Sequence, residues 1–211
     1  MVEELVELTS SLPAHNIVEI GVFQGGSAAL LALLPTTEKL LAIEYNDLGG
    51  TALEQFVTDT GRQERVFLAS ETDQADRESV LAAVASAGMA VLDLVIDDAS
   101  HRYDETVSSF NTLFPLIRPG GVYMLEDWQW AHVRGIGLGE EFAPRGATSL
   151  TTMVFEMVMA CATNTDVIDD VRIGPDAVLV RRGPAALDPD GFALRDLYDE
   201  ISADLLGDWS T

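Results

Sequence analysis

Short strand-like runs alternate with longer helical patterns along this chain, and each run ends in polar or acidic residues. The run at residues 17–20 is followed by an apolar helical pattern over residues 27–34. Largely apolar strands are typical of a parallel sheet with helices on both faces, because neither side of such a strand meets water. The alternation therefore predicts an α/β fold built on one mostly parallel sheet.

The same strand-and-helix order continues as far as residue 126, and the chain then ends differently. Residues 167–173 and 177–181 flank the turn Gly174-Pro175-Asp176, which predicts an antiparallel pair. Together these elements predict a Rossmann-like, doubly wound, mostly parallel seven-stranded sheet with a C-terminal antiparallel hairpin. The other expected strands cover residues 40–44, 66–69, 91–97 and 122–126, and the other helices cover residues 51–60, 75–87, 103–117 and 150–161.

The chain has 211 residues without an internal repeat, a low-complexity tract or a linker, which predicts a single domain over residues 1–211. We expect three additions to the sheet. They are a helical cap over residues 1–15, a lid loop over the glycine-containing segment 128–148, and an amphipathic C-terminal helix over residues 191–206.

The formal net charge is −23 at pH 7, and Lys39 is the one lysine of the chain. Such a surface repels phosphate backbones and anionic lipid, so we expect neither nucleic acid nor a membrane as partner. No apolar run is long enough to cross a bilayer, and the first residues are acidic, unlike a cationic secretory leader. These features predict a cytoplasmic protein.

A glycine-containing loop follows the first strand, where the chain reads V-E-I-G-V-F-Q-G-G-S over residues 18–27. Glycine lets the backbone approach a ligand closely, and the next helix offers free N–H groups. The spacing differs from the G-x-G-x-x-G loop that holds a dinucleotide pyrophosphate. Glu19 would repel a pyrophosphate but attract a cationic amino acid group, which favours S-adenosylmethionine over NAD.

Polar residues also follow the second and third strands. Glu44 ends the second strand, where an acid accepts both ribose hydroxyls of a nucleoside. Ser70 and Glu71 follow the third strand and are candidates for the adenine edge, or else solvated loop residues. The predicted cofactor-binding residues are Glu19, Gly21, Phe23, Gly25, Ser27, Glu44, Tyr45, Ser70, Glu71 and Asp97.

Two pairs of acids end the fourth and fifth strands, at Asp97-Asp98 and Glu126-Asp127. Clustered carboxylates raise one another's pKa unless a cation lies between them, and Mg²⁺ or another hard divalent cation prefers oxygen ligands. We therefore predict that Asp98, Glu126 and Asp127 bind a divalent metal, with Asp98 also part of the catalytic centre. The alternative is that these acids cap helices or pair with arginines.

His101 lies three residues after Asp98, and its imidazole has a suitable pKa to accept a hydroxyl proton. We predict that it is the catalytic base, with a helix-capping or surface histidine as the alternative. Trp128, Trp130 and His132 open the long segment and are predicted to form a wall for the substrate, the alternative being ordinary packing.

The blocks E-I-G-V-F-Q-G-G-S, I-D-D-A-S-H and R-P-G-G-V-Y-M-L-E-D together resemble the class I S-adenosylmethionine-dependent methyltransferases. Within that family they are similar to the branch of macrolide-sugar O-methyltransferases and cephalosporin hydroxylase-like proteins. The resemblance implies methionine binding at Glu19, Gly21 and residues 25–27, ribose binding at Glu44, and magnesium ligands at Asp98, Glu126 and Asp127. It also implies His101 as the base and a homo-oligomeric assembly.

The sequence thus predicts a metal-assisted O-methyltransferase that uses S-adenosylmethionine and acts on a hydroxyl of a small secondary metabolite, such as a sugar, polyketide or polyol. Three alternatives remain open at this point. They are an S-adenosylmethionine-binding enzyme that catalyses cyclisation or elimination, a non-catalytic partner protein with this fold, and an NAD-dependent oxidoreductase. The glycine spacing argues against the last of these.

Overall fold

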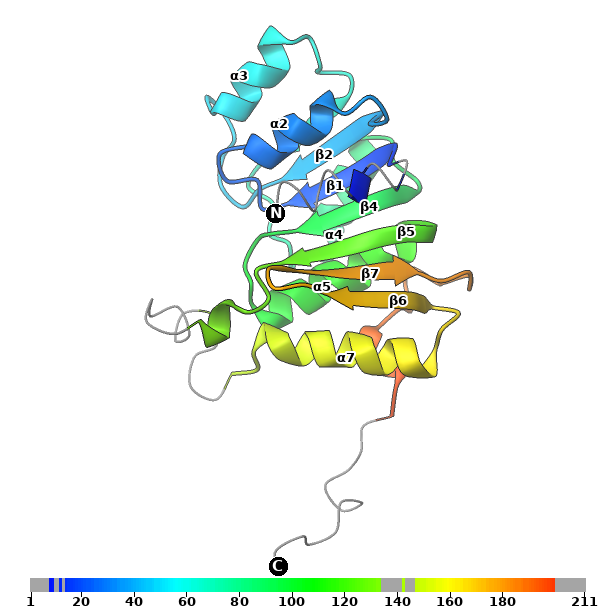
Figure 1. The fold of residues 1–211 in the computed structure, drawn as a ribbon. Coiled ribbons are helices and arrows are strands. Elements are labelled where there is room, and N and C mark those ends of the chain that lie inside the picture. Colours follow the sequence, from blue (N-terminus) through cyan, green and yellow to red (C-terminus); the bar gives the residue numbers. More distant parts are fainter. Residues whose placement is uncertain (1–7, 10–11, 13, 134–141, 143–146, 200–211) are drawn as a thin grey trace, which may run out of the picture.

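In the computed structural model, seven strands form one mixed sheet in the order β3-β2-β1-β4-β5-β7-β6 (Figure 1). The structure describes residues 8–9, 12, 14–133, 142 and 147–199. β7 runs antiparallel to both of its neighbours, and the other pairings are parallel. The strands are β1 (Asn16–Ile20), β2 (Lys39–Ile43), β3 (Val66–Ala69), β4 (Leu92–Asp97), β5 (Ile117–Glu126), β6 (Ile168–Ile173) and β7 (Ala177–Arg182). The predicted fold class is confirmed.

The strand order reverses between β1 and β4, which are hydrogen-bonded neighbours although β2 and β3 separate them in the chain. The chain continues from these two strands into helices on opposite faces of the sheet, and a cavity opens at the carboxyl edge of the strands. Open α/β sheets bind their ligands at such a point.

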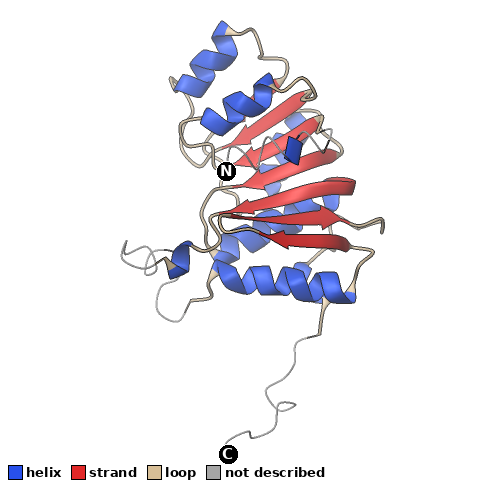
Figure 2. Ribbon diagram, viewed as in Figure 1, coloured by secondary structure: helices blue, strands red, loops and turns tan. Residues whose placement is uncertain are grey.

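Helices cover both faces of the sheet, as Figure 2 shows. On one face lie α2 (Gly26–Leu33) and α3 (Ala52–Asp59), and their buried residues share a core with Leu8 and Leu12. The other face carries α4 (Arg77–Ser86), α5 (Tyr103–Leu113) and α7 (Leu150–Thr163) over the larger core. Among the described residues, no helix is both long and apolar enough to span a bilayer.

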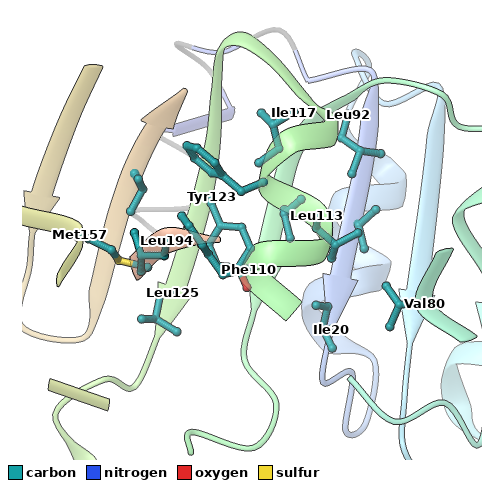
Figure 3. Packing of buried hydrophobic residues seen from close by; sticks show 14 of the residues in the cluster. Ile20, Val80, Leu92, Phe110, Leu113, Ile117, Tyr123, Leu125, Met157 and Leu194 are labelled. Carbon is teal, nitrogen blue, oxygen red and sulfur yellow. The ribbon is translucent and has the colours of Figure 1, made fainter. Parts of the chain in front are cut away.

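The larger core is centred on aromatic rings between α5 and β5 (Figure 3). Phe110 stacks on Phe114 with ring centroids 4.6 Å apart, and it meets the edge of Tyr123 at 4.9 Å. All three side chains are fully buried. Burial of large aromatic side chains stabilises a domain of this size by several kcal/mol in total, at roughly 25 cal/mol per Å².

The segment before β5 differs from the prediction. Ile117 was expected at the end of a helix, with Pro119-Gly120-Gly121 as the turn into a strand that begins at Val122. In the structure α5 ends at Leu113, a 3₁₀ turn (η1, Phe114–Leu116) follows, and Ile117 already pairs with Leu92 in the sheet. The register shifts between Leu92 and Leu94, so the Pro-Gly-Gly sequence is an irregularity inside the strand.

The predicted C-terminal helix is wrong in its first part. Leu194–Leu197 form only a 3₁₀ turn (η3), and Tyr198 is extended with φ −150° and ψ 155°. The carbonyl oxygen of Leu197 accepts hydrogen bonds from the side chains of Thr163 and Asn164, which hold this turn against α7. Residues 200–211, which include Ile201 and Leu205, lie outside the described residues.

The other additions to the sheet are described only in part. Leu8 and Thr9 are helical and buried, while residues 1–7 lie outside the described part of the chain. In the predicted lid loop the structure describes a 3₁₀ turn (η2, Trp130–His132) and Phe142. The helical cap, the lid and the single domain over residues 1–211 stay predictions.

Candidate active site

A cavity of about 800 Å³ opens at the carboxyl edge of the parallel strands, where the strand order reverses. Its volume lies in the range of about 300–1,000 Å³ that is usual for small-molecule sites. The loops after β1, β2, β3, β4 and β5 all contribute to its wall. The lining residues are Ile20, Gly21, Phe23, Ile43, Glu44, Tyr45, Asn46, Thr72, Asp73, Gln74, Asp98, Ala99, Ser100, His101, Arg102, Glu105, Asp127, Trp130 and Phe142.

The loop after β1 is held by the end of β2. The backbone amides of Val22 and Phe23 donate to Glu44 Oε2 at 2.9 and 3.0 Å, and Asn46 donates to Oε1 through both its backbone and side chain. Burial alone would raise the pKa of Glu44, but the hydrogen bonds from Asn46, Phe23 and Val22 prevail and lower it. Glu44 is therefore an ionised acceptor at the wall of the cavity, with Tyr45 beside it.

Gly21 and Gly25 both adopt positive φ, at 84° and 79°. Gly25 precedes the first turn of α2 and packs against Leu53, so a Cβ there would come within 2.5 Å of that side chain. Ser27 lies in the first turn of α2 and hydrogen-bonds to Glu19. The predicted glycine loop thus forms a tight strand-to-helix turn, in which Gly21 and Phe23 line the cavity.

Glu19 is a buried acid beneath this turn, with a side chain only 1% exposed. Its Oε2 has no hydrogen-bond partner among the described residues. Burial raises the pKa of Glu19 to about 7; the bond to Ser27 opposes that rise and the charge of Glu126 adds to it. Glu19 does not line the cavity itself, but it lies close enough to Asp98 to raise the pKa of that carboxyl.

The loops after β4 and β5 bring Asp98, His101 and Asp127 together. One potential ligand atom from each of the three lies within 4.8 Å of the other two. The Nε2 atom of His101 is 3.8 Å from Asp98 Oδ1. Glu126 is buried and acts on the cluster electrostatically, but its side chain does not line the cavity. Of the predicted metal ligands, Asp98 and Asp127 are thus adjacent, and His101 joins them.

The crowded acids of this cluster disfavour ionisation of Asp98. Burial raises the pKa of Asp98 to about 8, with further contributions from the charges of Glu126, Asp127 and Glu19. Burial also raises the pKa of Asp127, as does nearby Asp176, although a hydrogen bond from Trp130 lowers it. A cation between these carboxylates would relieve the repulsion.

His101 is buried under aromatic rings and is 8% exposed. Its ring centroid lies 4.6 Å from that of Trp130 and 5.6 Å from that of Phe142. Burial lowers the pKa of His101 to about 4, against a hydrogen bond to the backbone carbonyl of Glu126. Since the neutral ring uses its single N–H in that bond, its other nitrogen is left as an acceptor.

Among the described residues, the non-glycine positions with positive φ are Phe23, Glu71, His101 and Asp127, at 47°, 52°, 54° and 54°. Each follows one of the parallel strands, and three of the four line the cavity. Such conformations cost about 1–3 kcal/mol each and gather at functional sites, where the surroundings hold them in place.

Several predicted site residues lie away from the cavity wall. Ser70 Oγ accepts the backbone amide of Leu48, and Glu71 is exposed. The carboxylate of Asp97 is buried on the α5 face of the sheet, where it accepts hydrogen bonds from Ser109 and Tyr123 at 2.5 Å.

Of the three residues predicted to form a wall for the substrate, only one lines the cavity. Trp130 lines the cavity, whereas Trp128 packs on the larger core and donates to the carbonyl of Gly174 at 3.1 Å. His132 is exposed and lies 2.7 Å from Thr151 Oγ1.

Part of the wall lies beyond the residues singled out from the sequence. Thr72 and Asp73 belong to the polar segment expected after the third strand, but Ser70 and Glu71 were chosen in their place, and Gln74 was not foreseen. Their polarity directly after a strand was the available signal. Arg102 and Glu105 extend the wall from the start of α5, and their side chains lie 3.8 Å apart.

Curated proteins match this chain over short segments with more than 40% sequence identity. Demethylmacrocin O-methyltransferase of Streptomyces fradiae is 43% identical over 58 residues, which are 28% of this chain and 15% of that protein. Mycinamicin VI 2''-O-methyltransferase of Micromonospora griseorubida is 49% identical over 45 residues, 21% of this chain and 11% of that protein. The aligned segments therefore cover a small part of either relative.

Solved structures share the fold over most of the chain. MycE methyltransferase, in a complex with Mg, SAH and mycinamycin VI, matches with a TM-score of 0.58 and 23% identity, over 80% of this chain and 44% of that one. The O-methyltransferase TomG from Streptomyces achromogenes, in complex with SAM, matches with a TM-score of 0.57 and 20% identity, over 86% and 78%. At these identities the likeness shows the fold.

A protein-family model described as a methyltransferase domain matches residues 18–128. The match begins inside β1 and ends two residues after β5, so it includes every parallel strand that borders the cavity. It spans more than half of the 211 residues. This chain belongs to the methyltransferase-domain family.

Proposed function

We propose that this chain binds S-adenosylmethionine and transfers its methyl group to a hydroxyl of a small natural product. The favoured acceptor is a sugar hydroxyl, and a divalent cation assists the reaction. The observation that carries the proposal is the division of one cavity into two ends. Glu44 and Tyr45 line one end, and the Asp98, His101 and Asp127 cluster lines the other. The first end suits a nucleoside and the second suits a hydroxyl that must lose a proton.

The nucleoside end has the donors and acceptors that this cofactor needs. Glu44 keeps its charge and faces the cavity, so it can accept hydrogen bonds from ribose hydroxyls. Glu19 is a second acid, buried under the glycine turn, and its Oε2, which has no hydrogen-bond partner among the described residues, would be available to the cationic methionine amino group. When bound, S-adenosylmethionine supplies an electrophilic methyl group on a positively charged sulfur.

The residues of the cluster fit a divalent cation. Asp98 and Asp127 offer carboxylate oxygens within 4.8 Å of each other, and a bound cation would offset both the burial and the neighbouring acids that raise the pKa of Asp98. Oxygen ligands favour Mg²⁺ over softer metals. A cation held by Asp98 and Asp127, with Glu126 near, would orient the acceptor hydroxyl and make it more acidic.

His101 then has a distinct task as the base. Its ring N–H is engaged by the Glu126 carbonyl, so the second nitrogen would accept the hydroxyl proton and leave the acceptor oxygen free to attack the methyl group that the cofactor supplies. Asp98 lies 3.8 Å from the ring, and with a bound cation keeping its carboxyl ionised it would stabilise the imidazolium that forms. If His101 were instead a metal ligand, a softer metal such as Zn²⁺ would be expected.

Two observations support a sugar as the methyl acceptor, namely the residues that line the cavity near His101 and the names of the curated relatives. Trp130 and Phe142 add apolar rings to the cavity wall, and Arg102 and Glu105 add polar groups to it, a combination that suits the mixed surface of a sugar. Both curated relatives described above carry O-methyltransferase names, and one of them names a 2''-hydroxyl. A homo-oligomeric assembly stays a prediction.

The proposal is tested by calorimetric titration of S-adenosylmethionine, S-adenosylhomocysteine and NAD, with Mg²⁺ and with EDTA. We expect binding of both S-adenosyl compounds and none of NAD. Incubation with glycosylated polyketides should then give products heavier by one methyl group. Asp98→Asn and His101→Gln should abolish that product, whereas Asp104→Asn, on the exposed side of α5, should not. Folded protein that binds neither S-adenosyl compound would contradict the proposal.

A further inference from the structure

A buried polar network lies beneath the cavity, on the α5 face of the sheet. Its centre is the carboxylate of Asp97, which accepts hydrogen bonds from Ser109 Oγ and Tyr123 Oη at 2.5 Å each. Asp97, Ser109 and Tyr123 are 1%, 0% and 0% exposed, so no solvent competes for these bonds. The network therefore anchors whatever else is bonded to it.

Gln74 connects this network to the cavity. Its Nε2 lies 3.3 and 3.4 Å from the two carboxylate oxygens of Asp97 and 3.2 Å from Ser109 Oγ. Its Oε1 accepts the backbone amide of Ser100 at 2.9 Å. Because an amide N–H can only donate, the oxygen of Gln74 must face Ser100 and its nitrogen must face Asp97. The partners thus fix the orientation of the side chain.

The bond to Ser100 lies in the loop that carries the reactive groups. This loop leaves β4 at Asp98, whose amide donates to the carbonyl of Ile20 at 2.9 Å. Two residues later the amide of Ser100 is held by Gln74, and His101 follows with φ 54°. The two backbone anchors hold residues 98 and 100, and His101 comes directly after the second anchor, so they limit how far the backbone of Asp98 and His101 can move.

We infer that Gln74 is a positioning residue, which couples the loop after β3 on the nucleoside side of the cavity to the pose of His101 and Asp98 on the hydroxyl side. The role of those two residues rests on the proposed function, but the positioning itself does not. Gln74 also lines the cavity, so a nucleoside that settles against the loop after β3 would stiffen the same connection. A displacement of about 1 Å in a reacting group can cost about 100-fold in rate.

The inference is tested first without turnover. Gln74→Met keeps the length and volume of the side chain but removes both hydrogen-bonding groups, so NMR should show faster amide hydrogen exchange at Ser100. Thr72→Val is the matched control, because Thr72 lines the same wall but its side-chain hydroxyl donates within its own loop, to the carbonyl of Ser70. Its exchange at Ser100 should equal that of the unmodified protein. Equal exchange in Gln74→Met would overturn the inference.

A comparison of kcat with ligand affinity then shows whether Gln74 positions the loop or contacts the ligand itself. Gln74→Met should lower kcat by about 10- to 100-fold and leave the Kd for S-adenosylhomocysteine within about threefold. A loss of affinity as large as the loss of kcat, with unchanged exchange at Ser100, would show that Gln74 contacts the ligand instead. If the unmodified protein transfers no methyl group, the proposed function fails while the exchange result still decides the inference.

A milder variant covers the case in which Gln74→Met does not fold. Tyr123→Phe removes one donor to Asp97 without touching the cavity wall. It should raise exchange at Ser100 above that of the unmodified protein, which tests the network without Gln74→Met. Where Gln74→Met does fold, its effect on exchange should be the larger one, and in a variant that carries both changes the two effects should not add, because residues of one hydrogen-bond network are coupled. Full additivity, or no effect of Tyr123→Phe at Ser100, would count against the network.

Discussion

Gly21 and the backbone of Asp98 are packed against each other at the carboxyl edge of the sheet. A Cβ built on Gly21 would come within 2.2 Å of the carbonyl oxygen of Asp98 and within 2.6 Å of the Cα of Ala99. These neighbours are main-chain atoms that cannot rotate away. The loops after β1 and β4, which carry the two ends of the cavity, therefore share a contact that only glycine permits.

Gly21→Ala is expected to disturb both loops. The clash and the φ of 84° should together lower the free energy of unfolding by ~2 kcal/mol or more and abolish S-adenosylhomocysteine binding. Gly26→Ala is the control for stability, since a Cβ there meets nothing within 4 Å and its φ is ordinary. Denaturant unfolding of both variants measures the difference. Equal stabilities would show that the loops are not packed as described.

Asp98→Asn should change how stability depends on pH. The pKa of Asp98 is raised from 3.8 to about 8, so between these values the folded state holds more protons than the unfolded state. Its free energy of unfolding therefore falls as pH rises through that window. Without divalent metal, Asp98→Asn should be more stable than the unmodified protein by ~1 kcal/mol or more at about pH 8, with little difference at about pH 4.

Thermal unfolding at the two pH values checks this expectation, and Mg²⁺ supplies the control. A bound cation offsets the repulsion among the acids, so Mg²⁺ should stabilise the unmodified protein more than Asp98→Asn at about pH 8. A stability gap that is the same at both pH values would mean that the carboxyl of Asp98 does not titrate abnormally.

Glu44→Gln tests the nucleoside end. The carboxylate accepts two backbone amides of the loop after β1, and a glutamine amide can accept with only one of its two terminal atoms. We expect affinity for S-adenosylhomocysteine to fall by about 10-fold or more, with ~1–2 kcal/mol lost in stability. Glu71→Gln, at an exposed position outside the cavity wall, should change neither. Calorimetry that finds equal affinities would remove Glu44 from the cofactor site.

Trp130→Ala tests the burial of His101. Trp130 lies 4.6 Å from the imidazole, so its removal admits water and should raise the pKa of His101 from about 4 back toward its ordinary value of 6.5. Trp128→Phe is the contrasting change. It removes a hydrogen bond to Gly174 and should cost ~1 kcal/mol of stability without altering His101. NMR titration of the imidazole distinguishes the two, and an unchanged pKa in Trp130→Ala would contradict the role of the ring.

The sequence by itself determined the order of strands and helices and the edge at which the site lies. Continuous apolar runs, glycine turns and acids after strands are local signals, and parallel strands bring all their carboxyl ends to one edge. Gly21, Glu44, Asp98, His101 and Asp127 therefore lie on the cavity wall where the pattern placed them.

Only the tertiary structure decided which way neighbouring side chains face. Asp97 and Asp98 are adjacent acids, yet Asp97 belongs to β4 and points into the core under α5, while Asp98 begins the loop and faces the cavity. Ile117 likewise joins the sheet because Leu92 offers it a partner. Gln74 could not be recognised locally, since its partners Asp97 and Ser100 lie 23 and 26 residues away. Such roles depend on contacts between distant segments, which no local pattern of residues encodes.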